Sequence, residues 1–244
     1  MKRRSGIRAS SPILCLGVVL VLVMASSVAS ADRAANPIKF SKAKILIELN
    51  ATAQDAGIQM LLDGEGWEHV KVYSPDGGEV LDIRARGSVG VIGVTELFFE
   101  SAEPSLADLP LADLLEMFPE GKYRIEGTTV EGKDMVGTAR LRHDIPAGPH
   151  VVVPLEGGIT DADNTVIDWD PVIEPAGIQI RGYQVIVELE EPLRIFSVEL
   201  PAEVTAVTVP AEFLDPGTAY KFEILAIAKS GNQTITESTF ATAP

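Results

Sequence analysis

The sequence predicts an all-β protein made of two tandem β-sandwich domains, with one short helix in the first. Short runs rich in β-branched and apolar residues are separated by Gly, Pro, Asn and Asp at intervals of roughly 8 to 12 residues, as in sandwiches. The 244 residues exceed by far the roughly 100 residues of one sandwich. Residues 143–150 (HDIPAGPH) interrupt the strand pattern with two prolines and a glycine, which predicts a domain boundary there.

The first 31 residues have the pattern of a cleaved export signal. A basic start precedes an apolar run over residues 13–24, and Ala29-Ser30-Ala31 supplies the small residues that a signal peptidase requires. The run of about 12 residues is shorter than the roughly 20 that span a bilayer. The sequence therefore predicts cleavage after Ala31, a polar leader over residues 32–41, and no stable membrane insertion after cleavage. The only cysteine, Cys15, stands at the start of the apolar run, which argues against lipidation.

Charge and cysteine content limit the class of protein. The net charge of −15 falls to −19 when the four basic residues of the predicted signal are removed, so nucleic acid and anionic lipid would be repelled. Without Cys15 the exported chain can form no disulfide, and its stability must come from apolar cores. These features favour a bacterial envelope protein, periplasmic or secreted.

The first domain is expected over residues 42–146 as an immunoglobulin-like sandwich. One turn, residues 74–78 (SPDGG), is typical of a hairpin, and another hairpin is expected to turn at residues 131–133. The helix is predicted over residues 110–118, because Leu111, Leu114, Leu115 and Phe118 have helical spacing after a proline. The predicted strands cover residues 43–50, 57–62, 69–74, 79–84, 95–100, 121–130 and 134–142.

The second domain is expected over residues 147–244. Its residues 214–220 read L-x-P-G-T-x-Y, and Phe222, Ile224 and Ala226 follow on alternate positions. Together with a Trp in one upstream strand (165–171) and a Tyr in the next (180–187), this pattern closely resembles a fibronectin type III domain. The resemblance spans residues 149–243. It implies structural roles for five residues: Trp169 and Tyr183 in the core, and Leu214, Pro216 and Tyr220 around the tyrosine corner.

Catalytic and metal-binding motifs are scarce. The exported chain has no thiol nucleophile, the sequence has no serine-hydrolase, zinc-protease or nucleotide-binding motif, and its three histidines are far apart. We therefore assign no catalytic residue and do not expect an enzyme. The spacing of Asp161, Asp163 and Asn164 resembles half of an oxygen-rich calcium loop, without its central Gly and distal Glu, which makes Asp161, Asp163 and Asp168 candidate calcium ligands. The alternative is a solvated turn. No other cofactor is indicated.

One strand carries a candidate ligand-binding row. If Val70 and Val72 point inward, strand alternation places Trp67, His69 and Tyr73 together on the opposite face, where they could hold a sugar ring or a peptide. The alternative is that the predicted helix covers this face and makes the aromatic residues part of the core.

The sequence thus favours an exported, non-catalytic binding or scaffold protein of the bacterial cell envelope, acting through β-sandwich modules on a protein or glycan partner. The alternative is a carbohydrate-active enzyme or an accessory carbohydrate-binding module, because type III modules often accompany such catalytic domains. The first domain, of about 110 residues, has no recognisable set of catalytic residues, which favours a binding function.

Overall fold

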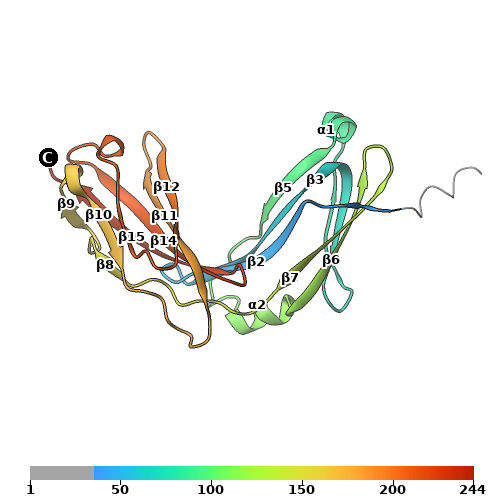
Figure 1. Ribbon diagram of the computed structural model, residues 1–244, viewed down its shortest axis with the longest axis horizontal. Helices are drawn as coiled ribbons and strands as arrows, with labels where there is room; N and C mark the ends of the chain where they lie inside the picture. The colour runs from blue at the N-terminus through green and yellow to red at the C-terminus, as the bar shows by residue number, and fades with distance from the viewer. Residues whose placement is uncertain (1–35) are drawn as a thin grey trace, which may run out of the picture. The chain divides into compact units, whose positions relative to one another are not determined.

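The computed structural model describes residues 36–244, so the predicted signal peptide with Cys15 lies outside the described residues. The all-β fold class is confirmed, because the described residues form mainly strands, with two short α-helices. Figure 1 shows their arrangement. The N-terminal module contains β1 (Ile38–Lys39), β2 (Lys42–Asn50), β3 (Asp55–Tyr73), β4 (Glu79–Arg84), α1 (Gly87–Ile92), β5 (Val94–Glu100), α2 (Leu111–Met117), β6 (Gly121–Thr129) and β7 (Asp134–Leu141). The C-terminal module contains β8 (Val151–Val153), β9 (Gly158–Thr160), β10 (Val166–Trp169), β11 (Ile180–Leu189), β12 (Arg194–Pro201), β13 (Ala206–Thr208), β14 (Ala219–Ala228) and β15 (Gln233–Thr242).

One long strand organises the N-terminal module. The first half of β3 pairs with β2 and β5, and its second half pairs with β4 and β6. From β6 the sheet continues through β7 to the short β1. The expectation of two separate strands, 57–62 and 69–74, is wrong, because the segment DGEGWE between them continues the strand.

Glycine serves close packing in this strand and not a turn. A Cβ atom on Gly64 would lie 3.0 Å from the Met135 side chain and 3.1 Å from the Phe40 ring. A side chain at Gly64 would therefore displace its neighbours. The pairing register with β5 shifts between Asp63 and Trp67, so the strand is also irregular here. A glycine pair in such a position looks like a turn in the sequence, although it marks an irregular stretch within one strand.

The predicted polar leader, residues 32–41, is partly structured. Ile38 and Lys39 form β1, which pairs in parallel with Met135 and Val136 of β7. Phe40 is buried in the N-terminal core. The leader expectation is therefore wrong for these residues, because Phe40 is buried in the core and Ile38 packs against the same core.

The predicted helix is confirmed as α2, with Pro110 before it and Phe118 after it. Leu114 is buried, and Leu111, Leu115 and Phe118 pack against the same core. The other helix, α1, was not predicted, and it has no buried residue. Among the residues that the structure describes, neither helix is long and apolar enough to cross a membrane.

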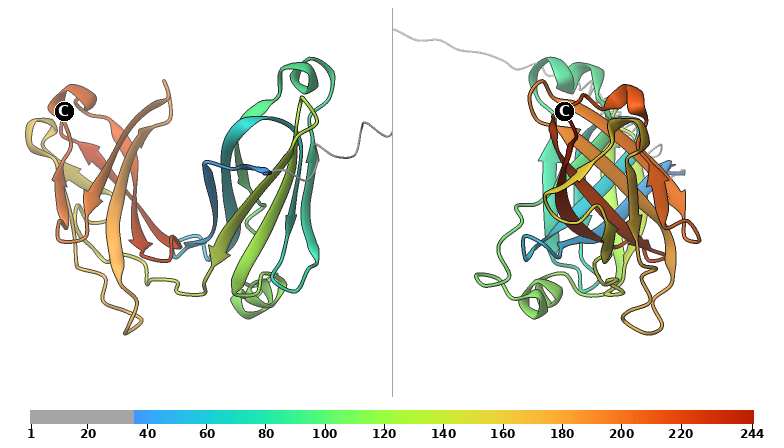
Figure 2. Two further views of the ribbon diagram at one scale, coloured as in Figure 1. Left: turned by 45° about the vertical axis from the view of Figure 1, so that its right-hand side comes forward. Right: turned by 90° about the vertical axis from the view of Figure 1, so that its left-hand side faces the viewer.

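The C-terminal module has two layers. One layer holds β13, β10 and β8, and the other holds β12, β11, β14 and β15 in that order. Figure 2 shows β11, β14 and β15 as neighbouring strands. Seven strands in a three-stranded and a four-stranded layer form the fibronectin type III fold expected from the resemblance. The short β9 adds a parallel pairing to β15.

The landmark residues lie where the resemblance places them. Trp169 and Tyr183 are both 1% exposed and meet edge to face, with ring centroids 5.3 Å apart. The Tyr220 hydroxyl accepts a hydrogen bond of 2.7 Å from the Asp215 backbone N–H. This bond ties the start of β14 to the turn before it, which is the tyrosine corner. Leu214 is buried beside this turn, and Pro216 lies exposed within it.

Each module has its own hydrophobic core, one built from residues 40–145 and the other from residues 167–240. Backbone pairing nevertheless links the two modules, because β15 of the C-terminal module pairs in parallel with β2 of the N-terminal module. A third small apolar cluster, Leu225, Ile227 and Ile235, lies on the face of β14 and β15 that does not face the C-terminal core. The predicted boundary at residues 146 and 147, and the separate folding of the modules, stay predictions.

Candidate functional site

The predicted aromatic row does not form one face. Trp67 is fully buried together with Val70, although these residues are three positions apart on one strand. The pairing of β3 with β6 explains this arrangement. Trp67 lies opposite Thr129 and His69 lies opposite Thr128, so β3 carries one extra residue between them. Such a bulge reverses the alternation, and the expectation of Trp67 as a surface ligand-binding residue is wrong.

His69 and Tyr73 lie on the outer face within a network of charged side chains. His69 Nε2 lies 2.7 Å from Asp82 Oδ1, and Lys71 Nζ lies 2.6 Å from Glu79 and 2.9 Å from Asp82. Lys71, followed by His69, lowers the pKa of Asp82. The Arg124 guanidinium lies over the Tyr73 ring at 4.1 Å from its centroid. These groups are satisfied by one another, so the row is a charged outer surface and not an aromatic platform.

The three aspartates proposed for calcium are not brought together. The Asp161 side chain accepts a 3.0 Å hydrogen bond from the Asp163 backbone N–H at the start of a 3₁₀ turn, Ala162–Asn164. Asp168 lies on β10, opposite Ala206. Within residues 36–244, these carboxylates do not belong to any group of three potential ligands that lie close to one another. The turn therefore has a structural explanation, in which Asp161 caps it.

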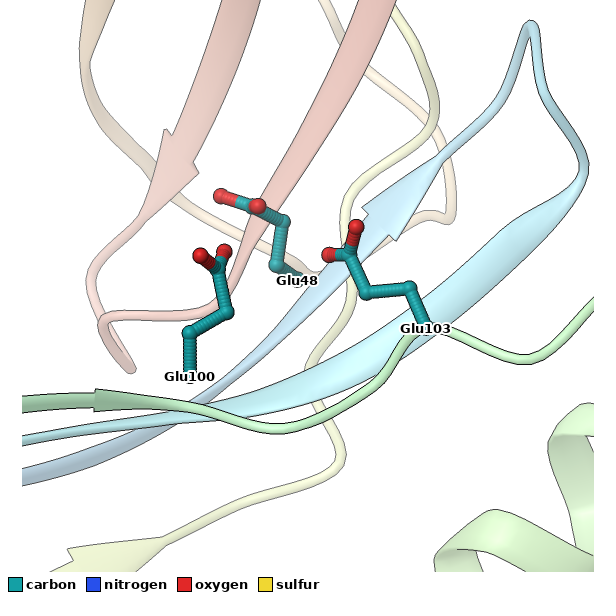
Figure 3. A group of neighbouring side chains, drawn as sticks. All are labelled: Glu48, Glu100 and Glu103. Carbon is teal, nitrogen blue, oxygen red and sulfur yellow. The ribbon is translucent and has the colours of Figure 1, made fainter.

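A different group of carboxylates is the candidate site. Glu48 of β2, Glu100 at the end of β5 and Glu103 after it offer oxygens that all lie within 4.8 Å of one another. Figure 3 shows the three carboxyl groups turned toward one region, with Glu48 arising from a different strand than the other two. Glu48 is 6% exposed, whereas Glu100 and Glu103 are exposed.

Two glutamines complete this glutamate cluster. Gln233 of β15 donates a side-chain hydrogen bond to Glu48, and Gln59 of β3 donates one of 3.0 Å to Glu100. The cluster thus includes residues from β2, β3, β5 and β15. The amide groups offset part of the cost of burying negative charge.

The surroundings of Glu48 and Glu103 favour the protonated forms of these two carboxyl groups. Burial raises the pKa of Glu48, although the hydrogen bond from Gln233 opposes this effect. Burial, followed by the charges of Glu48 and Glu100, raises the pKa of Glu103 to about 7. Glu103 is exposed as a residue, but its carboxyl group turns toward Glu48 (Figure 3). Close carboxylates of this kind share protons, and their oxygens are also the ligands that hard divalent cations prefer.

Sequence reasoning missed this cluster, although one signal was present. Glu48 is the only charged residue in the run ILIEL, residues 45–49, and a carboxylate inside an apolar strand needs a partner when it is buried. No sequence pattern connects Glu48 with residues 100–103, because they meet only through the pairing of β2 and β5 to opposite sides of β3.

The junction between the modules is a second set of buried polar contacts. Asn232, 1% exposed, accepts a 2.9 Å hydrogen bond from the Ile47 N–H. Its amide donates to the carbonyl oxygens of Arg142 and Asp144 at 2.7 and 3.1 Å. Nearby, the Thr234 hydroxyl donates to the Pro146 carbonyl at 2.6 Å. Side chains of the last hairpin therefore satisfy backbone groups of the N-terminal module and of the linker.

Comparisons with known proteins concern the fold alone. No model of a known protein family matches the chain, and no curated protein matches it. Among solved structures, it is similar to the FN1–FN3 domains of chicken CNTN1, with 12% identity, a TM-score of 0.33 and coverage of 85% of this chain and 68% of that chain. A segment of two fibronectin type III domains from chicken tenascin gives 12% identity, a TM-score of 0.30 and coverage of 80% and 97%. The spore cortex lytic enzyme SleM of Clostridium perfringens gives 18% identity and a TM-score of 0.27, over 40% of this chain and 27% of that chain.

Proposed function

We propose that this protein is an exported, non-catalytic binding or scaffold protein of a bacterial cell envelope, acting through its β-sandwich modules. The observation that carries the proposal is the use of the large side chains. Trp67, Tyr123, Trp169, Tyr183 and Tyr220 are all at most 2% exposed, so they build the two cores. Loops, outer strands and the junction surface then remain for contact with a partner.

Export is part of the proposal and rests on the first 31 residues. Their basic start, apolar run and Ala-x-Ala ending support cleavage after Ala31. Intact-mass measurement of the protein recovered from the envelope or the medium tests this point. A mass that begins at Asp32 supports export, whereas a chain that retains residues 1–31 in the cytoplasm contradicts it.

A carbohydrate-active function is the second candidate, and the glutamate cluster favours it. A carboxyl group with a pKa of about 7 beside a second carboxylate is the arrangement that glycosidases use for acid catalysis. However, Glu48 is buried, so a sugar would reach only Glu100 and Glu103. The hydrogen bonds from Gln59 and Gln233 also give the cluster a structural role, since they link its strands.

A paired assay separates the two candidates. The purified chain from Asp32 onward is incubated with polysaccharide, peptide and ester substrates, and it is separately immobilised to capture partners from a bacterial envelope extract. The binding function predicts saturable capture of a defined partner and no turnover. Hydrolysis that is lost in Glu103→Gln, with Glu116→Gln as the exposed-glutamate control from α2, would overturn it.

A further inference from the structure

A basic groove lies where strands of the two modules meet. It has a volume of about 360 Å³. Lys44 of β2 and Arg140 of β7 contribute to its lining, together with Arg181 of β11 and Lys229 after β14. Glu199 of β12 is the one acidic residue that lines it.

The charge of this groove is opposite to that of the molecule. The chain carries 20 basic and 35 acidic residues, yet the groove gathers four cations against one carboxylate. All four cations are exposed. Among the described residues, none of the four lies within 4.0 Å of a carboxylate, and Lys229 is hydrogen-bonded to the neutral Gln179 at 2.8 Å. Their charges are therefore available to an anion, and a concave lining concentrates their potential.

The adjoining depression extends the basic surface. It shares Lys229 with the groove and adds Arg142, whose guanidinium lies 3.9 Å from the Asp144 carboxylate. Arg142 is thus partly neutralised, whereas Arg140 and Arg181 form no ion pair among the described residues.

The lining also indicates the chemistry of the occupant. Leu46 and Ile227 line the groove beside the cations, and no aromatic residue does. Sugar rings are usually held by stacking on aromatic faces, which this groove does not offer. Arginine forks bind carboxylates through two parallel hydrogen bonds, and the apolar lining suits the methylene groups of glutamate.

We propose that this groove binds an acidic segment of a partner polypeptide, with its glutamate or aspartate carboxylates on Arg140 and Arg181. The inference rests on the proposed binding function and names the chemistry of the partner. The basic groove attracts an acidic peptide, and the acidic surface around it repels the peptide. This difference gives both attraction and orientation.

The test uses a fluorescein-labelled peptide of alternating glutamate and alanine, and measures its binding by fluorescence anisotropy at low salt. The groove variant is Arg140→Glu with Arg181→Glu. The matched control is Arg86→Glu with Lys39→Glu, two exposed cations outside the groove with the same total change in charge. We expect the groove variant to weaken binding at least about tenfold, and the control about twofold or less. Raising the salt to about 0.15 M should weaken wild-type binding further.

Three outcomes of the binding measurements would overturn the inference, and a fourth comes from capture in extract. The first is no peptide binding at low salt, and the second is an equal loss in the groove variant and its control. The third is tighter binding of an alginate oligosaccharide of equal charge that depends on the same two arginines, which would make the ligand a glycan. The unfolding midpoints of both variants are measured as well, because an unchanged midpoint shows that a loss of peptide affinity does not come from unfolding. If wild type and groove variant capture the same partner from extract equally well, the inference about the groove is wrong, while the proposed binding function still holds. Hydrolysis of a substrate would contradict the proposed function.

Discussion

The two modules build their cores from different side chains. In the C-terminal module, five aromatic contacts connect the rings of Trp169, Tyr183, Phe196, Phe213, Tyr220, Phe222 and Phe240. In the N-terminal module the buried residues are mainly aliphatic, with Trp67 and Tyr123 as the large fully buried rings. Aromatic residues at fixed spacing allow the fold to be predicted from the sequence, whereas an aliphatic core is compatible with many strand arrangements.

The modules nevertheless share one device. Tyr123 follows the segment Phe-Pro-Glu-Gly-Lys, and its hydroxyl donates a 3.1 Å hydrogen bond to the Pro119 carbonyl. Tyr220 follows Asp-Pro-Gly-Thr-Ala, and its hydroxyl accepts from the Asp215 N–H. Each tyrosine ties the start of its strand to a Pro and Gly turn, but the direction of the hydrogen bond is opposite. The first of these corners was not recognised in the sequence.

The largest expected effect concerns the two tryptophans. Trp67→Ala and Trp169→Ala should each lower the free energy of unfolding by about 3 to 5 kcal/mol, because each ring is at most 1% exposed and its removal leaves a cavity. Denaturant titration measures both changes. A loss below about 0.5 kcal/mol for Trp67→Ala would mean that Trp67 lies on the surface, as the row interpretation required.

The second effect tests whether the two modules fold independently of each other. A fragment of residues 147–244 should unfold cooperatively, but about 2 to 5 kcal/mol less stably than the same module in the full chain. The fragment exposes Leu225, Ile227 and Ile235 and removes the partners of Asn232. Tryptophan fluorescence of the full-length Trp67→Phe variant provides the reference, because Trp169 is then the only tryptophan. An unfolded fragment would show that the modules are interdependent.

The third effect isolates the junction. Asn232→Ala removes one hydrogen bond that the side chain accepts and two that it donates, at a residue that is 1% exposed. The substitution should therefore lower the free energy of unfolding by about 2 to 4 kcal/mol. Thr234→Val, which removes a single hydrogen bond to Pro146, should cost less. Chemical denaturation of the full chain checks the order of the two losses. Equal stability of Asn232→Ala and wild type would show that water replaces these contacts.

The fourth effect compares the two corners. Tyr220→Phe should cost about 1 to 3 kcal/mol, since it leaves the Asp215 N–H without its acceptor. Tyr123→Phe leaves a carbonyl at Pro119 without its donor, and we expect about 1 kcal/mol. Unfolding midpoints of the two variants decide the order. The reverse order would show that the N-terminal corner is the stronger constraint.

The smallest effect concerns the glutamate cluster. The pKa of Glu103 is raised to about 7 from an ordinary value of 4.5, so the folded state favours its protonated form. The stability that this preference contributes is present below pH 4.5 and is lost as the pH rises through about 7. Glu103→Gln should therefore flatten the decline in thermal midpoint between pH 5 and pH 8, with Glu116→Gln as a control. Identical pH profiles for wild type and Glu103→Gln would contradict the raised pKa.

The sequence by itself determined the all-β class, the α2 helix, and the positions of Trp169, Tyr183 and Tyr220. Each depends on local spacing, because a helical or alternating period and a Pro-Gly turn act within a few residues. Only the tertiary structure decided that Trp67 is buried, since one extra residue between Trp67 and His69 reverses the face of the strand. Only pairing brought Glu48 to Glu103 and gathered Lys44, Arg140 and Arg181 around one groove. These residues are far apart in the chain, and their proximity follows from strand pairing between distant segments, which no local pattern encodes.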